Sequence, residues 1–133
     1  MSKIGEFLAG AGTFYLATAD GDQPKIRPLG MFLDGDDYVR FGIGTFKDCW
    51  KQLEANPKVE IVACQGAHWL RYTGKAVIDT DPKYVEEALE KNPGLKNIYN
   101  EQTGNVMGIF HLEDATAYDI NLMPAMGCED MLA

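Results

Sequence analysis

Six segments of the chain are rich in apolar, β-favouring residues, and turn-forming residues separate most of them. This pattern predicts β-strands. Turns at 20–22 and 33–37 separate the first three segments at a spacing of about ten residues, which is typical of an antiparallel meander or barrel. The predicted strands cover residues 13–19, 25–33, 38–43, 58–65 and 68–79, with a last strand or strand pair inside 104–118.

Helical spacing of apolar residues predicts four helices between these strands. Thr45-Phe46-Lys47-Asp48 has the form of a capping box, with a hydroxyl at the N-cap and an acid three residues later. Asp81-Pro82 is a second start signal, because an acidic N-cap precedes proline at the first helical position. The predicted helices cover 2–11, 45–56, 82–91 and 95–99, whereas 121–133 has no clear pattern.

The fifth predicted strand, 68–79, separates into two faces. One face carries Leu70, Tyr72, Gly74, Ala76 and Ile78. The opposite face carries Trp69, Arg71, Thr73 and Lys75. The first face is therefore expected to be the core side.

The charge of the chain is unevenly placed. Its 133 residues fit one domain, 1–133, with a net charge of −8. Residues 1–78 are neutral, and residues 79–133 carry the whole excess of acids. An acidic chain without a basic stripe argues against binding to nucleic acid or to an anionic membrane surface. Half of the twelve Lys and Arg lie between Lys25 and Lys58, which is where an anionic small molecule would find positive charge.

Cysteine usage and missing motifs narrow the function further. The three cysteines, Cys49, Cys64 and Cys128, are widely spaced, so a disulfide framework or structural zinc is not expected, and a cytoplasmic location is. No signal peptide or apolar run long enough to span a membrane is present. Serine occurs once, and the motifs of serine hydrolases, zinc proteases and Gly-rich phosphate loops are missing. His111 lies in a predicted strand and is interpreted as a structural histidine.

Arg27-Pro28 stands in the middle of an extended segment between two turns. Pro28 biases Arg27 toward extended backbone and cannot donate to a sheet ladder, which implies an edge position or a break in pairing. An arginine fixed in such a strand could clamp phosphate with its planar fork. The alternative is a solvated arginine on an edge strand.

Thr45, Lys47 and Lys51 extend this possible anion site. Thr45 is placed at the start of a predicted helix, where free N–H groups and the helix dipole favour an anion. Lys47 falls in the first turn, which normally prefers acids, and Lys51 follows four residues later on the same face. A bound phosphate would explain both lysines, and a solvated lysine face is the alternative.

Trp69 and Arg71 form a second constellation on the polar side of their strand. Such a pair could stack on and clamp a planar ligand. It could equally lie in a subunit interface, where Trp and Arg are enriched. A site between two subunits would satisfy both interpretations.

Taken together, these motifs resemble the pyridoxamine 5′-phosphate oxidase-like family of FMN-binding split β-barrels. The resemblance covers about residues 5–120 and rests on the order and spacing of four weak motifs. They are Pro24-x-x-Arg27-Pro28, Thr45-x-Lys47, Lys51-Gln52-Leu53-x-x-Asn56-Pro57-x-Val59 and Trp69-x-Arg71-x-x-Gly74-x-Ala76.

The resemblance implies a mainly β, α+β fold: a six-stranded antiparallel split β-barrel with small helices. It also implies a homodimer with FMN at the subunit interface. Arg27, Thr45, Lys47 and Lys51 would hold the FMN phosphate, and the backbone from Arg27 to Met31, including Pro28, Leu29 and Gly30, would meet the isoalloxazine ring. Trp69 and Arg71 would lie near the flavin, including that of the partner subunit.

The chain departs from true pyridoxamine-phosphate oxidases, which are longer and end in a basic segment. Here the tail is acidic, at Cys128-Glu129-Asp130, and no arginine follows Arg71. The resulting hypothesis is a small FMN-dependent oxidoreductase with a small-molecule substrate and NAD(P)H as a candidate electron donor. The alternatives are a flavin store, sensor or electron-transfer protein, and a barrel that has lost its cofactor. Deazaflavin fits poorly because few basic residues could grip its tail, and haem would need His111 as a ligand.

Overall fold

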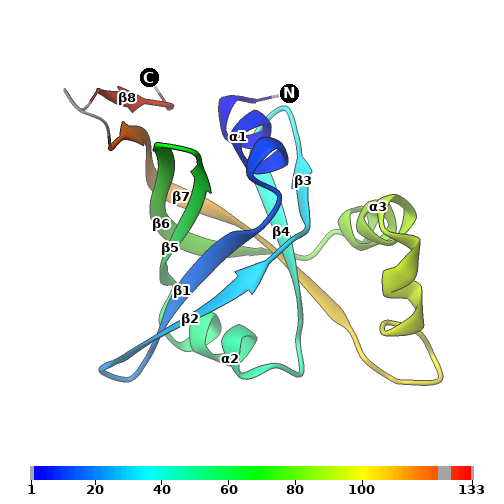
Figure 1. Ribbon diagram of the computed structural model, residues 1–133. Helices are drawn as coiled ribbons and strands as arrows, with labels where there is room; N and C mark the ends of the chain where they lie inside the picture. The colour runs from blue at the N-terminus through cyan, green and yellow to red at the C-terminus, as the bar shows by residue number, and fades with distance from the viewer. Residues whose placement is uncertain (1, 123–126, 133) are drawn as a thin grey trace.

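A computed structural model describes residues 2–122 and 127–132 of the chain. Within these residues, three α-helices and eight β-strands follow one another, with one 3₁₀-helix before the longest strand (Figure 1). In chain order they are α1 (Lys3–Ala11), β1 (Phe14–Asp20), β2 (Gln23–Leu29), β3 (Phe32–Asp34), β4 (Val39–Gly44), α2 (Asp48–Ala55), β5 (Lys58–Gln65), β6 (His68–Asp79), α3 (Pro82–Lys91), η1 (Pro93–Asn97), β7 (Met107–Asn121) and β8 (Cys128–Asp130).

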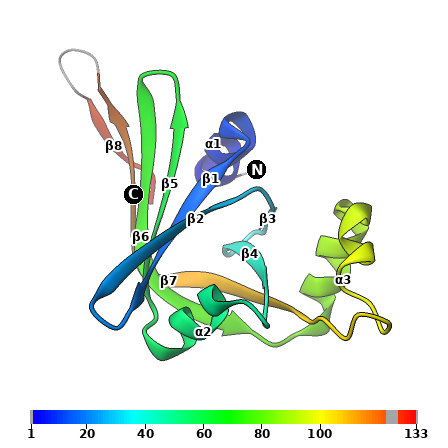
Figure 2. The same ribbon diagram turned by 60° about the horizontal axis from the view of Figure 1, so that its bottom comes forward.

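The strands form one antiparallel sheet in the order β2-β1-β5-β6-β7-β4-β3, and β8 pairs with the outer part of β7. The sheet curls into an open barrel, with α1 and α2 at opposite ends (Figures 1 and 2). The predicted α+β split β-barrel is confirmed. Five of the six predicted strands correspond to β1, β4, β5, β6 and β7, the strand predicted over 25–33 is divided into β2 and β3, and the short strand β8 is additional.

The main core fills the interior of the barrel. It combines apolar side chains from α1, α2 and the inward faces of the strands, among them the fully buried Phe14, Phe41 and Phe110. A smaller core lies outside the barrel, where Ala88 of α3 packs against Leu33, Met107 and Ile109. The expected core face of β6 is confirmed from Leu70 to Ala76, whereas Ile78 is 40% exposed.

The starts of α1 and α3 are set by local chemistry. The Ser2 hydroxyl accepts a hydrogen bond from the Gly5 N–H, and the Asp81 carboxylate accepts one from the Lys83 N–H. These bonds occupy N–H groups that a helix leaves without partners. The first residues of both helices are therefore fixed by side chains that lie next to them in the sequence.

Four predicted elements differ from the structure. The strand expected over 25–33 is broken at Gly30 and Met31 into β2 and β3. The helix expected over 45–56 begins only at Asp48, so Phe46 precedes it and is 48% exposed, outside the expected apolar stripe. The short helix expected over 95–99 is the 3₁₀-helix η1. The tail expected to lack a pattern contributes β8, although 123–126 and 133 lie outside the described residues.

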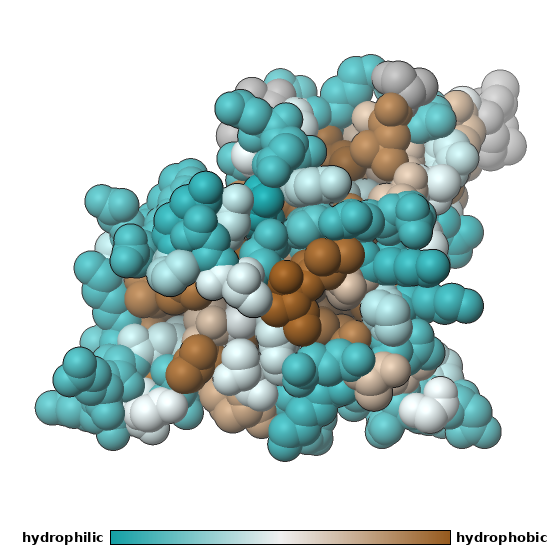
Figure 3. Space-filling model, turned by 180° about the vertical axis from the view of Figure 1, so that it is seen from behind, coloured by the Kyte–Doolittle hydropathy of each residue, from teal (hydrophilic) through white to brown (hydrophobic). Residues whose placement is uncertain are grey.

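The face seen from behind is mostly hydrophilic, and hydrophobic side chains form separate patches on it among polar ones (Figure 3). Within the described residues, no helix has the length and apolar character needed to cross a membrane.

Candidate anion and cofactor site

Arg27 lies on β2, but its side chain turns toward β1 and α2. Its Nη1 donates to the Thr18 hydroxyl at 2.7 Å and to the Leu16 carbonyl at 3.2 Å, while Nη2 donates to the Gln52 Oε1 at 3.1 Å. The Thr18 hydroxyl also donates to the same Gln52 oxygen at 2.7 Å. Neutral acceptors therefore hold a half-buried guanidinium, and no carboxylate among the described residues neutralises it.

Lys47 is the N-cap of α2, and no side chain caps this helix. The predicted capping box with Thr45 is wrong. The Thr45 hydroxyl instead donates to the Val106 carbonyl at 3.1 Å, and the Thr45 N–H donates to the same oxygen at 2.9 Å. Thr45 thus ties the end of β4 to the residue before β7. The N-terminus of α2 keeps its positive dipole end without a side-chain acceptor.

Arg27 and Lys47 lie on the same side of the molecule, near the first turn of α2. Both act on the thiol of Cys49, the second residue of that helix. Burial raises the pKa of this thiol, while the charges of Arg27 and Lys47 oppose the increase. Lys51 lies one turn further on and, with Gln52 and Asp20, borders a shallow hollow between α2 and the β1–β2 turn. The structure therefore gathers Arg27, Lys47 and Lys51 around one end of α2.

The cations of the chain fall into two groups. Six of the twelve Lys and Arg form ion pairs with acidic side chains: Lys3, Arg40, Arg71, Lys75, Lys83 and Lys91. The other six form none with the described residues: Lys25, Arg27, Lys47, Lys51, Lys58 and Lys96. In a chain of net charge −8, five of these six unpaired cations lie between residues 25 and 58. Three of these five, Arg27, Lys47 and Lys51, lie around α2.

Pro28, Leu29 and Gly30 lie at the end of β2 and just beyond it. Strand β2 is an edge strand, as Pro28 predicted, and it pairs only with β1. Pro28 does not interrupt this pairing, because it stands opposite Tyr15 in register. The break comes at Gly30, an exposed residue between β2 and β3, while Leu29 packs against the core.

Trp69 and Arg71 lie on the outer face of the sheet, opposite to the face from which Arg27 reaches α2. Arg27 stands in register with Leu16, whose side chain is in the core, whereas Leu70 and Tyr72 are the core residues of β6. Arg71 stacks over the Trp69 ring at 5.0 Å, and its Nε donates to the Glu60 Oε1 at 2.7 Å. One copy of the chain therefore does not bring this pair to Arg27.

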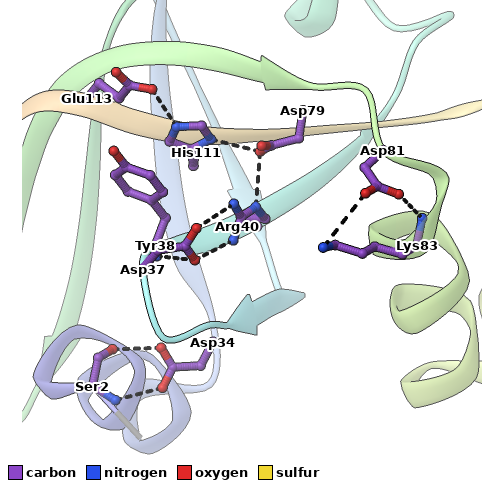
Figure 4. Close-up of polar contacts among 10 residues, drawn as sticks. All are labelled: Ser2, Asp34, Asp37, Tyr38, Arg40, Asp79, Asp81, Lys83, His111 and Glu113. Carbon is purple, nitrogen blue, oxygen red and sulfur yellow. Dashed lines mark hydrogen bonds and ion pairs between the residues drawn. The ribbon is translucent and has the colours of Figure 1, made fainter.

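A charged network around Arg40 was not expected from the sequence (Figure 4). The buried Arg40 donates to both Asp37 oxygens at 2.9 and 3.1 Å, and its Nε lies 3.3 Å from the Asp79 Oδ2. Its guanidinium also lies 4.0 Å from the centre of the Tyr84 ring. These hydrogen bonds hold the pKa of Asp37 well below its usual range. The sequence does contain one sign of this network, because Arg40 is the charged residue within the otherwise apolar segment Tyr38–Ile43.

His111 completes this network and is fully engaged. Its Nδ1 lies 2.8 Å from the Asp79 Oδ2, and its Nε2 lies 2.7 Å from the Glu113 Oε2. The Tyr38 ring stacks on the imidazole with centroids 4.0 Å apart. The interpretation of His111 as a structural histidine is thus confirmed, because it is 5% exposed and both ring nitrogens have partners.

Comparison with known proteins first identifies the class of fold. Many solved structures share the open antiparallel barrel of this chain. A family model described as pyridoxamine 5′-phosphate oxidase matches residues 1–116, and the chain belongs to this family. No curated protein matches it.

Three solved structures illustrate the likeness. A NimC/NimA family protein from Clostridium acetobutylicum is 32% identical, with a TM-score of 0.83, covering 96% of this chain and 90% of its own. A pyridoxamine 5′-phosphate oxidase-related, FMN-binding protein from Nostoc punctiforme is 14% identical, with a TM-score of 0.67 and coverages of 96% and 94%. A haem-binding protein from Mycobacterium smegmatis is 14% identical, with a TM-score of 0.71 and coverages of 95% and 55%. The last two show the fold alone.

Proposed function

We propose that the protein binds FMN as a homodimer and acts as a small flavin-dependent oxidoreductase. The observation that carries this proposal is the group of cations without acidic partners at the uncapped start of α2. Family membership and the flavin named for the Nostoc punctiforme protein support the choice of FMN. The flavin would carry the electron chemistry, which is consistent with the lack of a hydrolytic residue set in the sequence.

The residues at this site fit a phosphate group. Arg27 is held by neutral oxygens, so its positive charge stays available to a ligand. Lys47 adds charge at the helix start, and the free N–H groups of α2 suit the oxygens of a dianion. Lys51 follows one turn later and would contribute at longer range. Thr45 is turned to Val106, so in this arrangement its side chain would support the loop rather than bind phosphate directly.

Within the proposed site, the protein's own contribution is binding and orientation. Gln52 and Thr18 hold the Arg27 guanidinium in a fixed position, which lowers the entropy lost when an anion binds. The backbone from Pro28 to Met31 leaves the sheet at Gly30, so its polar groups could meet a flat ring instead of a neighbouring strand. No side chain is assigned a proton-transfer role.

Haem is the less favoured cofactor, although one structural neighbour is named as haem-binding. His111 would have to give up a carboxylate at either Nδ1 or Nε2 to ligate iron, and Tyr38 covers its ring. His68 is exposed, but its Nδ1 is bonded to Asp119 at the edge of the molecule, far along β6 from the unpaired cations.

The separation of the two predicted halves of the site supports the proposal of a homodimer. Trp69 and Arg71 face away from Arg27 within one chain, so only a second copy could add them to the same flavin. The outer face that carries them also presents Tyr15, Ile26 and Val62, and Tyr15 is 41% exposed. Aromatic and arginine side chains on such a face suit a subunit interface.

Two variants of matched exposure test the dimer. Tyr15→Glu places a charge on the proposed interface, and Ile98→Glu places one directly after η1, where Ile98 is 44% exposed. Sedimentation should give a dimer for the parent chain and Ile98→Glu, and a monomer for Tyr15→Glu. A monomeric parent, or a dimer unchanged by Tyr15→Glu, contradicts the proposed arrangement.

Flavin binding is tested directly on the purified protein. We expect a yellow protein, or one that becomes yellow with FMN, whose flavin is retained through gel filtration. Rapid bleaching by NADH or NADPH under nitrogen would support an oxidoreductase, whereas stable oxidised flavin with both donors would favour a flavin store or sensor. A colourless protein that takes up no FMN would contradict the main proposal.

A further inference from the structure

A cavity of about 420 Å³ lies beside the start of α1. Helix α2, which Arg27 contacts through Gln52, lies at the opposite end of the barrel from α1 (Figure 1). The start of α1, the β3–β4 turn, the middle of β7 and the residues after β8 form its wall. This volume is within the range of small-molecule sites. None of Arg27, Lys47 and Lys51 lines this cavity, so it is separate from the proposed phosphate site.

The floor of the cavity is apolar except for one hydroxyl. Ile4, Val39, Leu112 and Met131 contribute apolar surface, and Tyr72 joins them from the interior face of β6. Tyr72 is 3% exposed, and its hydroxyl has no hydrogen-bond partner among the described residues. Burial raises the pKa of Tyr72 to about 12, so the phenol stays protonated at neutral pH. A hydroxyl that lines a cavity and has no protein partner can bond to a ligand in that cavity.

The rim of the cavity is acidic. Asp37 and Glu113 already pair with Arg40 and His111, and Asp114 lies 3.8 Å from the Lys75 ammonium. The rim cation Lys3 is neutralised by Glu129 at 2.9 Å.

Asp36, in the β3–β4 turn, has neither an ion pair nor a hydrogen bond among the described residues. Its carboxylate is therefore the uncompensated charge at the mouth of the cavity, and a cation is the ligand group that it would attract.

We propose that this cavity binds a small organic cation with a ring-sized apolar body. The ammonium group pairs with Asp36, the body lies on the apolar floor, and a polar atom at the far end of the body bonds to the Tyr72 hydroxyl. Such a site is independent of the proposed flavin function and lies at the opposite end of the same barrel.

Three related compounds test the proposal by calorimetric titration of the full chain, with and without FMN. Tyramine carries an ammonium and a ring hydroxyl, phenethylamine lacks the hydroxyl, and 3-(4-hydroxyphenyl)propionate replaces the ammonium with a carboxylate. We expect tyramine to bind with a dissociation constant below about 1 mM and the carboxylate compound about tenfold more weakly. Absence of saturable tyramine binding near 1 mM, or equal binding of the carboxylate compound, overturns the proposal.

Two variants assign the contacts. Asp36→Asn should weaken tyramine and phenethylamine alike, by about tenfold, because both lose the charge-assisted contact. Tyr72→Phe should weaken tyramine about threefold to tenfold and leave phenethylamine unchanged, which a general loss of structure would not do. Asp22→Asn, in the β1–β2 turn, and Arg27→Ala are the controls and should bind tyramine as the parent does. Equal binding by the parent and Asp36→Asn, or equal weakening of both amines by Tyr72→Phe, contradicts the assignment.

Discussion

Arg27 and Arg40 both project from strands of the same sheet, yet their surroundings differ. Arg40 is buried between two carboxylates and two tyrosine rings, and the carboxylates match its charge. Arg27 is held by a hydroxyl, a carbonyl and an amide, which fix its position without matching its charge. The first environment belongs to a structural arginine, and the second leaves a positive charge for a ligand.

The largest expected effect is that of replacing Arg40 on the stability of the protein. Arg40→Met should lower the free energy of unfolding by about 3–5 kcal/mol, because Asp37 and the buried Asp79 lose their arginine partner, although Asp79 keeps its contact with His111. FMN affinity per folded molecule should not change. Lys91→Met removes the exposed pair with Glu87 and should cost at most about 1 kcal/mol in a urea titration. Equal losses in the two variants would contradict the structural role of Arg40.

Arg27→Ala is the corresponding test on the ligand side. It should weaken FMN binding by roughly 1.5–3 kcal/mol, because one charge-assisted contact to the phosphate is lost. Flavin fluorescence quenching measures this affinity. An affinity equal to that of the parent chain would show that the phosphate lies elsewhere.

A smaller effect is expected for the lysines. Lys47→Ala should weaken FMN by about 1 kcal/mol and Lys51→Ala by less, since Lys51 lies one turn further from the start of α2. Lys96→Ala is the matched control, because Lys96 is also unpaired but lies on η1. If Lys96→Ala weakens FMN binding as much as Lys47→Ala does, the loss of affinity reflects the net charge of the protein and not a specific contact of Lys47.

The smallest effect concerns pH and the Arg40 network. Hydrogen bonds from Arg40 hold the pKa of Asp37 below that of an unfolded chain. The stabilisation is therefore present above the ordinary aspartate pKa of about 3.9 and is lost as the pH falls below it. Urea titrations from pH 6 to pH 3 should show this loss in the parent chain and less of it in Asp37→Asn. A loss of the same size in Asp37→Asn would assign it to other carboxylates.

The sequence predicts those parts of the molecule that depend on near neighbours. Ser2 and Asp81 cap their helices through N–H groups two or three residues away, and the alternation along β6 separates its faces. Thr45 was misplaced because its hydroxyl bonds to Val106, a residue 61 positions away. The proposed group of Arg27, Lys47 and Lys51 could be suggested from the sequence because half of the Lys and Arg lie between Lys25 and Lys58.

The Arg40 network depends on strand register, which residue spacing does not give. Arg40 stands opposite His111 across β4 and β7, and Val77 stands opposite His111 across β6 and β7, which brings Asp79 within reach. Two polar residues inside apolar strands, Arg40 and His111, were the visible sign of this pairing. Their partners in loops and on other strands carry no local signal.

The edge position of β2 has a further consequence for the behaviour of the protein at high concentration. An exposed strand edge can recruit strands from other molecules and begin aggregation. Pro24 and Pro28, four residues apart on β2, lie on the same side of the strand and lack the N–H that such recruitment requires. Charged Lys25 and Arg27 stand between and beside them. The two prolines thus act as a built-in block against fibril growth at the free edge next to the proposed phosphate site.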